Sequence, residues 1–288
     1  MHQRRLPSFQ SLSSFLSFIS EQNEISTISA PISMHLEATE LHRRVIANGG
    51  PVLRLEHPLN ANGVTSPLPV VTNLFGTRQR VAWGLGTDQE GLASLGELLA
   101  WMQSPKPPRD LRQAGSLRNA LHARPRATSA PRDSRTADPD FTQLPVQTCW
   151  PDDAGPLITS CVVITRPPGD DKFENYNLGV YRMQVLDRDS AIMRWLPMRG
   201  GAKHYRQWQA LGEDCPAAVV IGADPAILLA AVMPAPETIS ELALAGVLNN
   251  QRIDMAPCAH IPLHAPASAE ILLEGTVSAS QTALEGPF

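Results

Sequence analysis

The sequence is poor in charged and aromatic side chains, and it has no long hydrophobic run. Charged residues make up 18% of the 288 residues and the net charge is −4, so the composition gives no reason to expect nucleic acid as a partner. No apolar segment approaches the length of a transmembrane helix. The basic start at residues 1–5 precedes a serine-interrupted stretch, which indicates an amphipathic helix rather than a signal peptide.

Cysteine is scarce, and the common catalytic and nucleotide-binding motifs are missing. None of the cysteines has CxxC spacing, which disfavours zinc and a disulfide framework and favours buried free thiols in a reducing cytoplasm. Gly84-Leu85-Gly86 does not extend to GxGxxG, and neither GxSxG nor HExxH occurs. A dinucleotide fingerprint is therefore absent from the sequence. The cysteines are Cys149, Cys161, Cys215 and Cys258.

The first part of the chain alternates helical and extended patterns. Apolar residues at helical spacing predict a helix over 9–19, and a second helix is predicted over 36–48. Short strands are predicted at 51–55 and 68–72. The segment 87–90 has the spacing of a capping box and predicts the start of another helix. This alternation is typical of an α/β domain.

The remaining sequence is richer in strand patterns. Residues 105–144 hold many prolines and basic side chains, which indicates a solvated connector with a short helix near 111–121; the alternative is an electropositive strip. Asp187-Arg188-Asp189-Ser190 separates two strand patterns and predicts a hairpin. We place an α/β domain at 1–125 and a β-rich domain at 126–288. Strands are predicted at 157–165, 178–186, 191–196, 217–222 and 269–278.

Two helices are predicted inside the β-rich region. Asp224-Pro225 puts a capping side chain before a proline at the first helical position, which predicts a helix over 226–233. The segment 238–241 is a second capping box with Glu241 at its third helical position. On that spacing alone, the Glu241 carboxylate caps its own helix.

Three arginines lie on or beside the predicted hairpin, close to three glycines. The planar guanidinium of arginine donates to phosphate in a bidentate geometry, and glycine lets backbone amides approach an anion. The residue types therefore suit an anion site, although arginines on a solvated strand face give the same pattern. These residues are Arg182, Arg194, Arg199, Gly179, Gly200 and Gly201.

Asn177 and Glu241 are oxygen ligands of the kind that a hard divalent cation takes. The alternatives are ordinary: Asn177 can satisfy a turn, and Glu241 can serve as the cap described above. Glu285 is one acid in a polar segment near the last residue, and without other information it is a mobile surface carboxylate.

Several separated motifs resemble the UbiD family of decarboxylases, and most of all the branch that acts on 3-polyprenyl-4-hydroxybenzoate. The resemblance implies an N-terminal α/β domain, a flavin-reductase-like split β-barrel that is incomplete here, and a C-terminal oligomerisation domain that this chain lacks. The motifs are Thr72-Asn73-Leu74-Phe75-Gly76-Thr77, Thr148-Cys149-Trp150-Pro151, Asn177-Leu178-Gly179-Val180-Tyr181-Arg182, Arg194-Trp195-Leu196-Pro197-Met198-Arg199-Gly200-Gly201, Pro266-Ala267-Ser268-Ala269-Glu270-Ile271 and Glu285-Gly286-Pro287-Phe288.

The cofactor that the resemblance implies is prenylated FMN (prFMN), made by a partner flavin prenyltransferase. Asn177 and Glu241 match the ligands of a divalent metal, usually manganese and often accompanied by potassium. Arg182 and Glu285 match members of the catalytic network. Met198 stands where close relatives often have histidine. The residues expected to line the cofactor are Val180, Tyr181, Arg182, Arg194, Trp195, Leu196, Arg199 and Gly200.

In the resembling family, the motif at 285–288 continues to an acidic proton donor. That acid falls beyond Phe288, so we expect this chain to be truncated and inactive alone, with Glu285 frayed near its end. The expected reaction converts 3-polyprenyl-4-hydroxybenzoate to 2-polyprenylphenol in ubiquinone biosynthesis. We expect a cytoplasmic protein of an oligomer-forming family, with peripheral contact to the inner membrane face through its polyprenylated substrate. The alternatives are a non-catalytic protein that binds flavin or a related subunit, and an ordinary FMN oxidoreductase.

Overall fold

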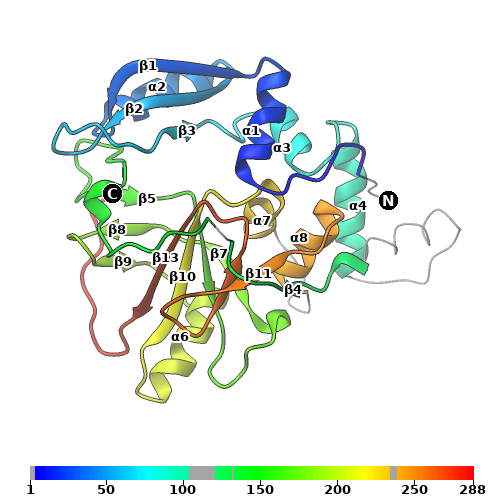
Figure 1. Ribbon diagram of the computed structural model, residues 1–288, viewed down its shortest axis with the longest axis vertical. Coiled ribbons are helices and arrows are strands. Elements are labelled where there is room, and N and C mark those ends of the chain that lie inside the picture. Colours follow the sequence, from blue (N-terminus) through cyan, green and yellow to red (C-terminus); the bar gives the residue numbers. More distant parts are fainter. Residues whose placement is uncertain (1–3, 104–120, 132, 234–238) are drawn as a thin grey trace, which may run out of the picture.

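The first region of the computed structural model is a small three-stranded sheet flanked by helices. The structure describes residues 4–103, 121–131, 133–233 and 239–288. Strands β1 and β2 are parallel, β2 and β3 are antiparallel, and α1 and α2 pack beside them (Figure 1). The elements of this region are α1 (Leu12–Glu21), β1 (Ile25–Ser33), α2 (Glu37–Ala47), β2 (Val52–Leu59), β3 (Val70–Thr72), α3 (Arg78–Gly84) and α4 (Gly91–Gln103).

The predicted helices at 9–19 and 36–48 and the predicted strands at 51–55 and 68–72 all form within a few residues of their expected bounds. The helix predicted to start at 87–90 forms as α4 from Gly91, and the capping contact is made by Asp88, whose Oδ1 accepts from Gly91 N–H at 2.8 Å. Strand β1 and helix α3 were not predicted. The helix expected at 111–121 lies almost entirely outside the described residues, at 111–120.

The second region is built on a four-stranded antiparallel sheet with the order β13-β10-β6-β7. Helices α7 and α8 cover one face, where they form the largest apolar core with β6, β7 and β10 (Figure 1). The other face packs on the sheet β5-β8-β9. The elements of these layers are β5 (Leu157–Ile158), β6 (Cys161–Thr165), β7 (Asn177–Val180), β8 (Met183–Val185), β9 (Ala191–Met193), β10 (Cys215–Ile221), α7 (Pro225–Ala230), α8 (Glu241–Asn249) and β13 (Ile271–Val277).

Smaller elements complete this region. A third sheet has the order β12-β11-β4, and helix α6 packs on β6, β7 and β10. The sheets of the described residues are open, so the split barrel stays a prediction. The remaining elements are β4 (Arg126–Ala127), the 3-10 turns η2 (Phe141–Gln143) and η3 (Phe173–Asn175), α6 (Gly200–Ala210), β11 (Asp254–Pro257) and β12 (His264–Pro266).

Local sequence signals explain several of these elements. The side chain of Asp187 accepts hydrogen bonds from the N–H and hydroxyl of Ser190 in the predicted hairpin between β8 and β9. Asp224 caps α7 as expected, and that helix ends at Ala230. The continuous strand expected at 157–165 is divided into β5 and β6. All four cysteines are free thiols.

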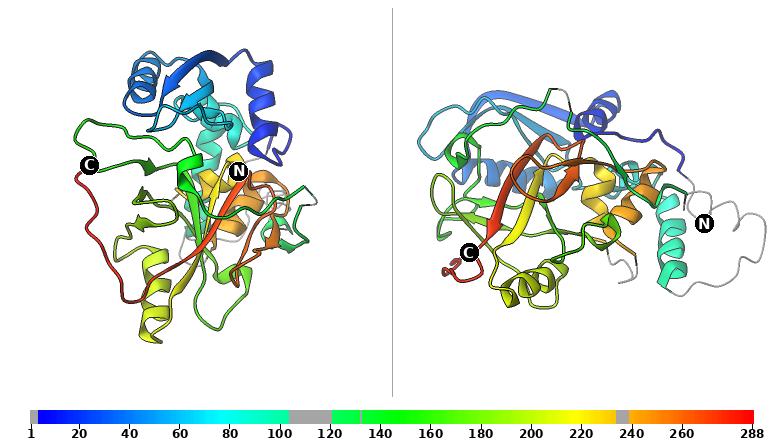
Figure 2. Two further views of the ribbon diagram at one scale, coloured as in Figure 1. Left: turned by 60° about the vertical axis from the view of Figure 1, so that its left-hand side comes forward. Right: turned by 60° about the horizontal axis from the view of Figure 1, so that its bottom comes forward.

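The two regions are joined by backbone and side-chain contacts. Thr148 exchanges backbone hydrogen bonds with Met34 and Leu36, and Gln147 Nε2 donates to Thr39 Oγ1 at 2.5 Å. Residues after β13 turn back beside the green strands (Figure 2), where Ala154 N–H donates to Pro287 O at 3.0 Å. In the described part of the chain, no helix is both long and apolar enough to cross a membrane.

Candidate flavin and carboxylate site

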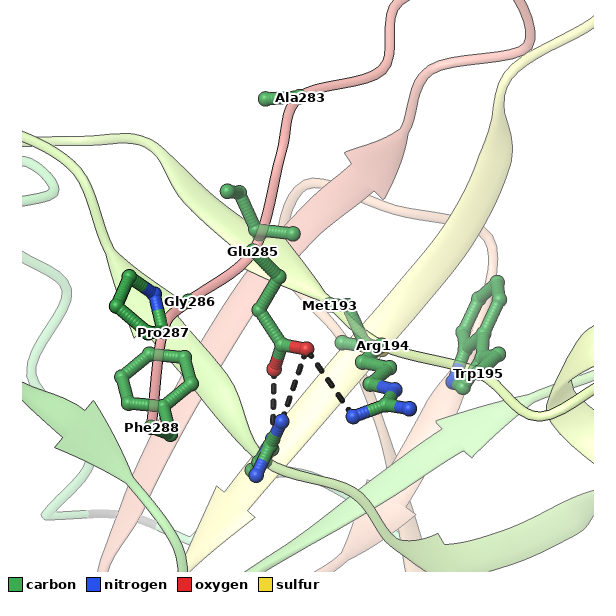
Figure 3. A pocket seen from close by; sticks show the side chains of 10 residues that line it. Met193, Arg194, Trp195, Ala283, Glu285, Gly286, Pro287 and Phe288 are labelled. Carbon is green, nitrogen blue, oxygen red and sulfur yellow. Dashed lines mark hydrogen bonds and ion pairs between the residues drawn. The ribbon is translucent and has the colours of Figure 1, made fainter. Parts of the chain in front are cut away.

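A cavity of about 550 Å³ opens between the β8-β9 hairpin and the segment 283–288. Its floor carries an ion pair: Arg182 Nε and Nη2 donate to the two carboxylate oxygens of Glu285, at 2.6 and 3.0 Å. Arg194 Nη1 lies 3.6 Å from Glu285 Oε2, and Figure 3 shows the carboxylate of Glu285 directed toward Arg194. The cavity is lined by Arg182, Ile192, Met193, Arg194, Trp195, Ala283, Glu285, Gly286, Pro287 and Phe288.

Glu285 is fixed rather than frayed, which corrects the expectation from the sequence. Its side chain is only 11% exposed. Gly286 N–H donates to Gln184 Oε1 at 3.0 Å, and the guanidinium carbon of Arg182 lies 4.9 Å from the centre of the Phe288 ring. Gln184 is buried on β8 and was missed by the sequence analysis; its signal is a polar side chain between Met183 and Val185 in an otherwise apolar strand. The hydrogen bond to Glu285 raises the pKa of Arg182 above its ordinary value.

The second part of the site lies where β7 meets the start of α6. Asn177 is the first residue of β7, and its side chain packs so closely on Gly200 that a Cβ at that glycine would overlap Asn177 Oδ1. Asn177 Nδ2 is buried and has no hydrogen-bond partner among the described residues. A buried amide donor without a partner is costly, which makes it a candidate ligand contact.

Glu241 reaches β7 from the start of α8, and its carboxylate also interacts with its own backbone N–H, the first of that helix. Ser240 is the N-cap of α8, and its Oγ accepts from Ala243 N–H at 3.2 Å. Glu241 is thus the first helical residue, and its Oε2 accepts from the backbone N–H of Leu178 at 3.2 Å. Burial raises the pKa of the Glu241 carboxyl above its ordinary value. Thr238 of the predicted capping box lies outside the described residues.

Tyr181 and Trp195 connect the two parts. Their rings form an edge contact with centroids 6.1 Å apart. Tyr181 Oη accepts from Gly201 N–H at 3.3 Å, and Trp195 both lines the cavity and packs on Gly201. Trp195 Nε1 is buried without a partner in the described structure. A peptide N–H and two side-chain donors therefore gather at the start of α6, where a helix favours an anion.

The other predicted site residues lie around these two parts. Val180 ends β7, Arg199 is the exposed N-cap of α6, and Leu196 is 44% exposed. Met198 is 70% exposed. The sequence analysis missed α6 and its His204, whose Nδ1 lies 2.9 Å from Thr165 Oγ1. Burial lowers the pKa of His204 to about 4, so this imidazole is neutral near pH 7.

Two family profiles match this chain. The N-terminal domain of 3-octaprenyl-4-hydroxybenzoate carboxy-lyase (UbiD) matches residues 16–99, and the Rift-related domain of the same enzyme matches 124–288, more than half of the chain. The chain belongs to the UbiD family. Family membership makes the two-part geometry around Trp195 a candidate cofactor and substrate site.

Solved structures agree with this assignment. The UbiD-class enzyme HmfF from Pelotomaculum thermopropionicum, in an evolved dimeric form with prFMN, is 26% identical, with a TM-score of 0.78 over 97% of this chain and 60% of that chain. Vanillic acid decarboxylase from Sedimentibacter hydroxybenzoicus, in its closed form, is 24% identical, with a TM-score of 0.80 over 97% and 57%.

A third UbiD-like fold is 3,4-dihydroxybenzoic acid decarboxylase (AroY) from Klebsiella pneumoniae, 23% identical with a TM-score of 0.75 over 93% of this chain and 54% of that one. At these identities the two benzoic acid decarboxylases show a shared fold alone. The UbiD chain described here spans 54–60% of the length of the three proteins.

Proposed function

We propose that this chain holds prFMN and a divalent metal in a carboxy-lyase that removes carbon dioxide from an aromatic acid without oxidation. The observation that carries the proposal is that Trp195, whose buried donor is unpaired, lines the cavity with the Arg182–Glu285 pair and packs on Gly201, next to the glycine that contacts the unpaired Asn177. Family membership and the prFMN bound by HmfF support the same reading. Val180, Leu196, Arg199 and Gly200 are proposed as further cofactor contacts.

The residues fit a metal ion on chemical grounds. Glu241 is half-buried, no nearby cation contributes to its raised pKa, and Asn177, which precedes its partner Leu178 on β7, offers an amide oxygen. A hard cation that carries a phosphate oxygen would compensate the carboxylate charge. We propose Mn²⁺ for this position, with K⁺ as a companion ion. Met198 occupies the position at which close relatives often have histidine, so this chain has no imidazole there.

When bound, prFMN supplies an electrophilic carbon and an electron sink for the bond cleavage. Arg182 is the residue of this chain suited to bind the substrate carboxylate, because its guanidinium faces the cavity and binds carboxylates in a bidentate geometry. Glu285 holds that guanidinium in place, and it is the one carboxyl side chain among the described residues that lines the cavity. Trp195 lines the cavity, and Tyr181 contacts both Trp195 and Gly201 near the start of α6.

The finer proposal for the substrate is 3-polyprenyl-4-hydroxybenzoate, decarboxylated in ubiquinone biosynthesis. It rests on the family resemblance, while the benzoic acid decarboxylases that share the fold act on smaller aromatic acids. With that substrate, a flavin prenyltransferase would supply the cofactor, and the polyprenyl tail would bring the protein to a membrane surface. We further propose a homo-oligomer, and domains at 1–125 and 126–288 with a split-barrel flavin fold in the second.

Flavin and metal titration tests the proposal. The quenching of FMN and prFMN fluorescence by the 288-residue chain is measured with and without Mn²⁺, and tighter binding with the metal is expected. Glu241→Gln is the matched control, because the amide oxygen keeps the hydrogen bond from Leu178 and loses the charge. Its flavin affinity is expected to become independent of Mn²⁺. Equal affinities with and without Mn²⁺ for the wild-type chain would refute the metal role, and no flavin binding would refute the cofactor site.

A further inference from the structure

Helix α8 connects the candidate metal position to the first residues of the chain. Glu241 at its start accepts a hydrogen bond from Leu178 N–H, and Asn249 at its end is only 4% exposed. Asn249 Nδ2 donates to Phe9 O at 2.9 Å, and Asn249 Oδ1 accepts from Phe9 N–H at 3.3 Å. One amide side chain thereby pairs with both backbone groups of Phe9, as a neighbouring strand would.

Residues 4–9, which we call the N-terminal arm, make two further bonds to this helix end. Arg4 Nη1 donates to Leu248 O at 3.0 Å, and Ser8 Oγ donates to Asn249 O at 2.8 Å. The last carbonyls of a helix have no partners within it and carry partial negative charge, so a cation there is stabilising. Burial lowers the pKa of Arg4 to about 10, which still leaves it charged near pH 7.

The arm is anchored in the first region of the molecule as well. The N–H groups of Arg5 and Leu6 both donate to Gly86 O, at 2.7 and 3.1 Å. The ring of Phe9 packs on Phe15 of α1, with centroids 4.9 Å apart. The arm therefore transmits the position of the first region to the end of α8.

The helix between these ends has little freedom to bend. Its side chains Leu242, Leu244 and Leu248 are fully buried, and a Cβ at Gly246 would overlap the carbonyl oxygen of His122. Nine helical residues span only about 13 Å. A shift at Asn249 is then passed along the helix to Glu241 rather than absorbed within it.

We propose that the N-terminal arm, through Asn249, positions Glu241 against the backbone N–H of Leu178 on β7. The role of Glu241 as a metal ligand rests on the function proposed above. The hydrogen bond from Leu178 to Glu241 is present in the protein without any ligand. Asn249 is a positioning residue, since it lies at the opposite end of the helix from the carboxylate.

Hydrogen exchange at the Leu178 amide tests this directly. Leu178 lies on β7, an edge strand, and its N–H is bonded to Glu241 rather than to another strand. In Asn249→Ala we expect this amide to exchange at least about 10-fold faster than in the wild type, because the carboxylate is displaced. The measurement is made on the full chain without flavin or metal, so it holds even where the cofactor proposal fails.

The control is Asn73→Ala. Asn73 is also buried and also donates to backbone carbonyls, those of Gly50 and Pro51, but it has no contact with α8. We expect Leu178 exchange in this variant to stay within about 2-fold of the wild type at matched stability. Equal acceleration in both variants, or an unchanged Leu178 rate in Asn249→Ala, would overturn the proposal.

Ser8→Ala is the milder second variant, for the case in which Asn249→Ala does not fold. It removes one hydrogen bond to the same helix end and keeps the amide pair of Asn249. A smaller acceleration of Leu178 exchange, with Mn²⁺ binding weakened in parallel, is expected. Acceleration confined to the arm, with none at Leu178, would count against positioning.

Discussion

The two parts of the site differ in whether their polar groups have partners within the protein. In the cavity, Glu285 meets two guanidinium groups, and the N–H of the next residue, Gly286, donates to Gln184. At the start of α8, Glu241 has backbone N–H partners but no cation, while Asn177 and Trp195, which pack at the start of α6, keep donors without partners in the described structure. The first arrangement is complete as a protein structure, whereas the second is one that a bound cation and anion would complete.

This difference separates two uses of charge. A paired carboxylate stabilises the geometry of its own arginine, and in the proposed function the Arg182–Glu285 pair would receive a carboxylate substrate. A half-buried carboxylate without a counter-cation destabilises the free protein and favours binding of an ion that neutralises its charge. The substrate would then bind to an arginine that is already held in place. Cofactor binding would instead be favoured because a cation neutralises the charge of Glu241.

The largest test of this comparison is Gly200→Ala. A Cβ at Gly200 would overlap Asn177 Oδ1 and displace the amide from the start of α6. We expect flavin affinity to fall by at least about 100-fold, near 3 kcal/mol, measured by fluorescence titration. Gly96→Ala is the matched control, because nothing lies within 4 Å of a Cβ there. A normal flavin affinity in Gly200→Ala would show that Asn177 takes no part in the site.

A second test uses Asp224, a buried carboxylate outside both parts. Burial raises its pKa to about 6 from 3.8, against two N–H donors that cap α7. Because the folded pKa is raised, stability is greatest below about pH 4 and falls as the pH rises through 6, by up to about 3 kcal/mol. Asp224→Asn keeps the cap and should remove this slope between pH 4 and 7 in urea unfolding. An unchanged slope would assign the pH dependence to other groups, with Glu241 as the first candidate.

The third test compares the two arginines of the cavity. Arg182 holds Glu285 with two short bonds, while Arg194 lies 3.6 Å away and is 54% exposed. Double-mutant cycles with Glu285→Gln should give a coupling of about 1–2 kcal/mol for Arg182→Met and below about 0.5 kcal/mol for Arg194→Met. Unfolding free energies measure both values. Equal couplings would mean that the carboxylate is shared rather than held by Arg182.

Local signals in the sequence predicted the elements that depend on neighbours in the chain. The helix over 9–19, the turn at Asp187 and the cap at Asp224 follow from spacing and side-chain chemistry. Strand β1 gave no such signal, because it is an edge strand with serines, a proline and a shifted register at Ile28/Pro31. Helix α6 was missed because it begins with two glycines.

The same distinction between local signals and distant contacts holds for the site. The sequence singled out Asn177, Arg182, Glu241 and Glu285. The structure pairs Arg182 with Glu285, and it packs Asn177 on Gly200 and Glu241 on the backbone of Leu178. The sequence could not show which residues contact this set. Gln184 lies 102 positions from its partner Gly286, and Leu178 lies 63 positions from its partner Glu241. The capping pattern placed Glu241 at the third helical position, whereas it is the first, and the pattern could not show the hydrogen bond from Leu178 on a strand that arrives from elsewhere in the chain.

Trp195 gives the site a built-in optical reporter. Its indole N–H is buried and unpaired, and its ring touches Tyr181 and Tyr205 while lining the cavity. Indole emission shifts with the polarity and hydrogen bonding of its surroundings, so an anion at the start of α6 and a ring in the cavity would each change the signal. With only five tryptophans in the chain, replacing the other four by phenylalanine would let a single emission band follow the occupancy of both parts in one titration.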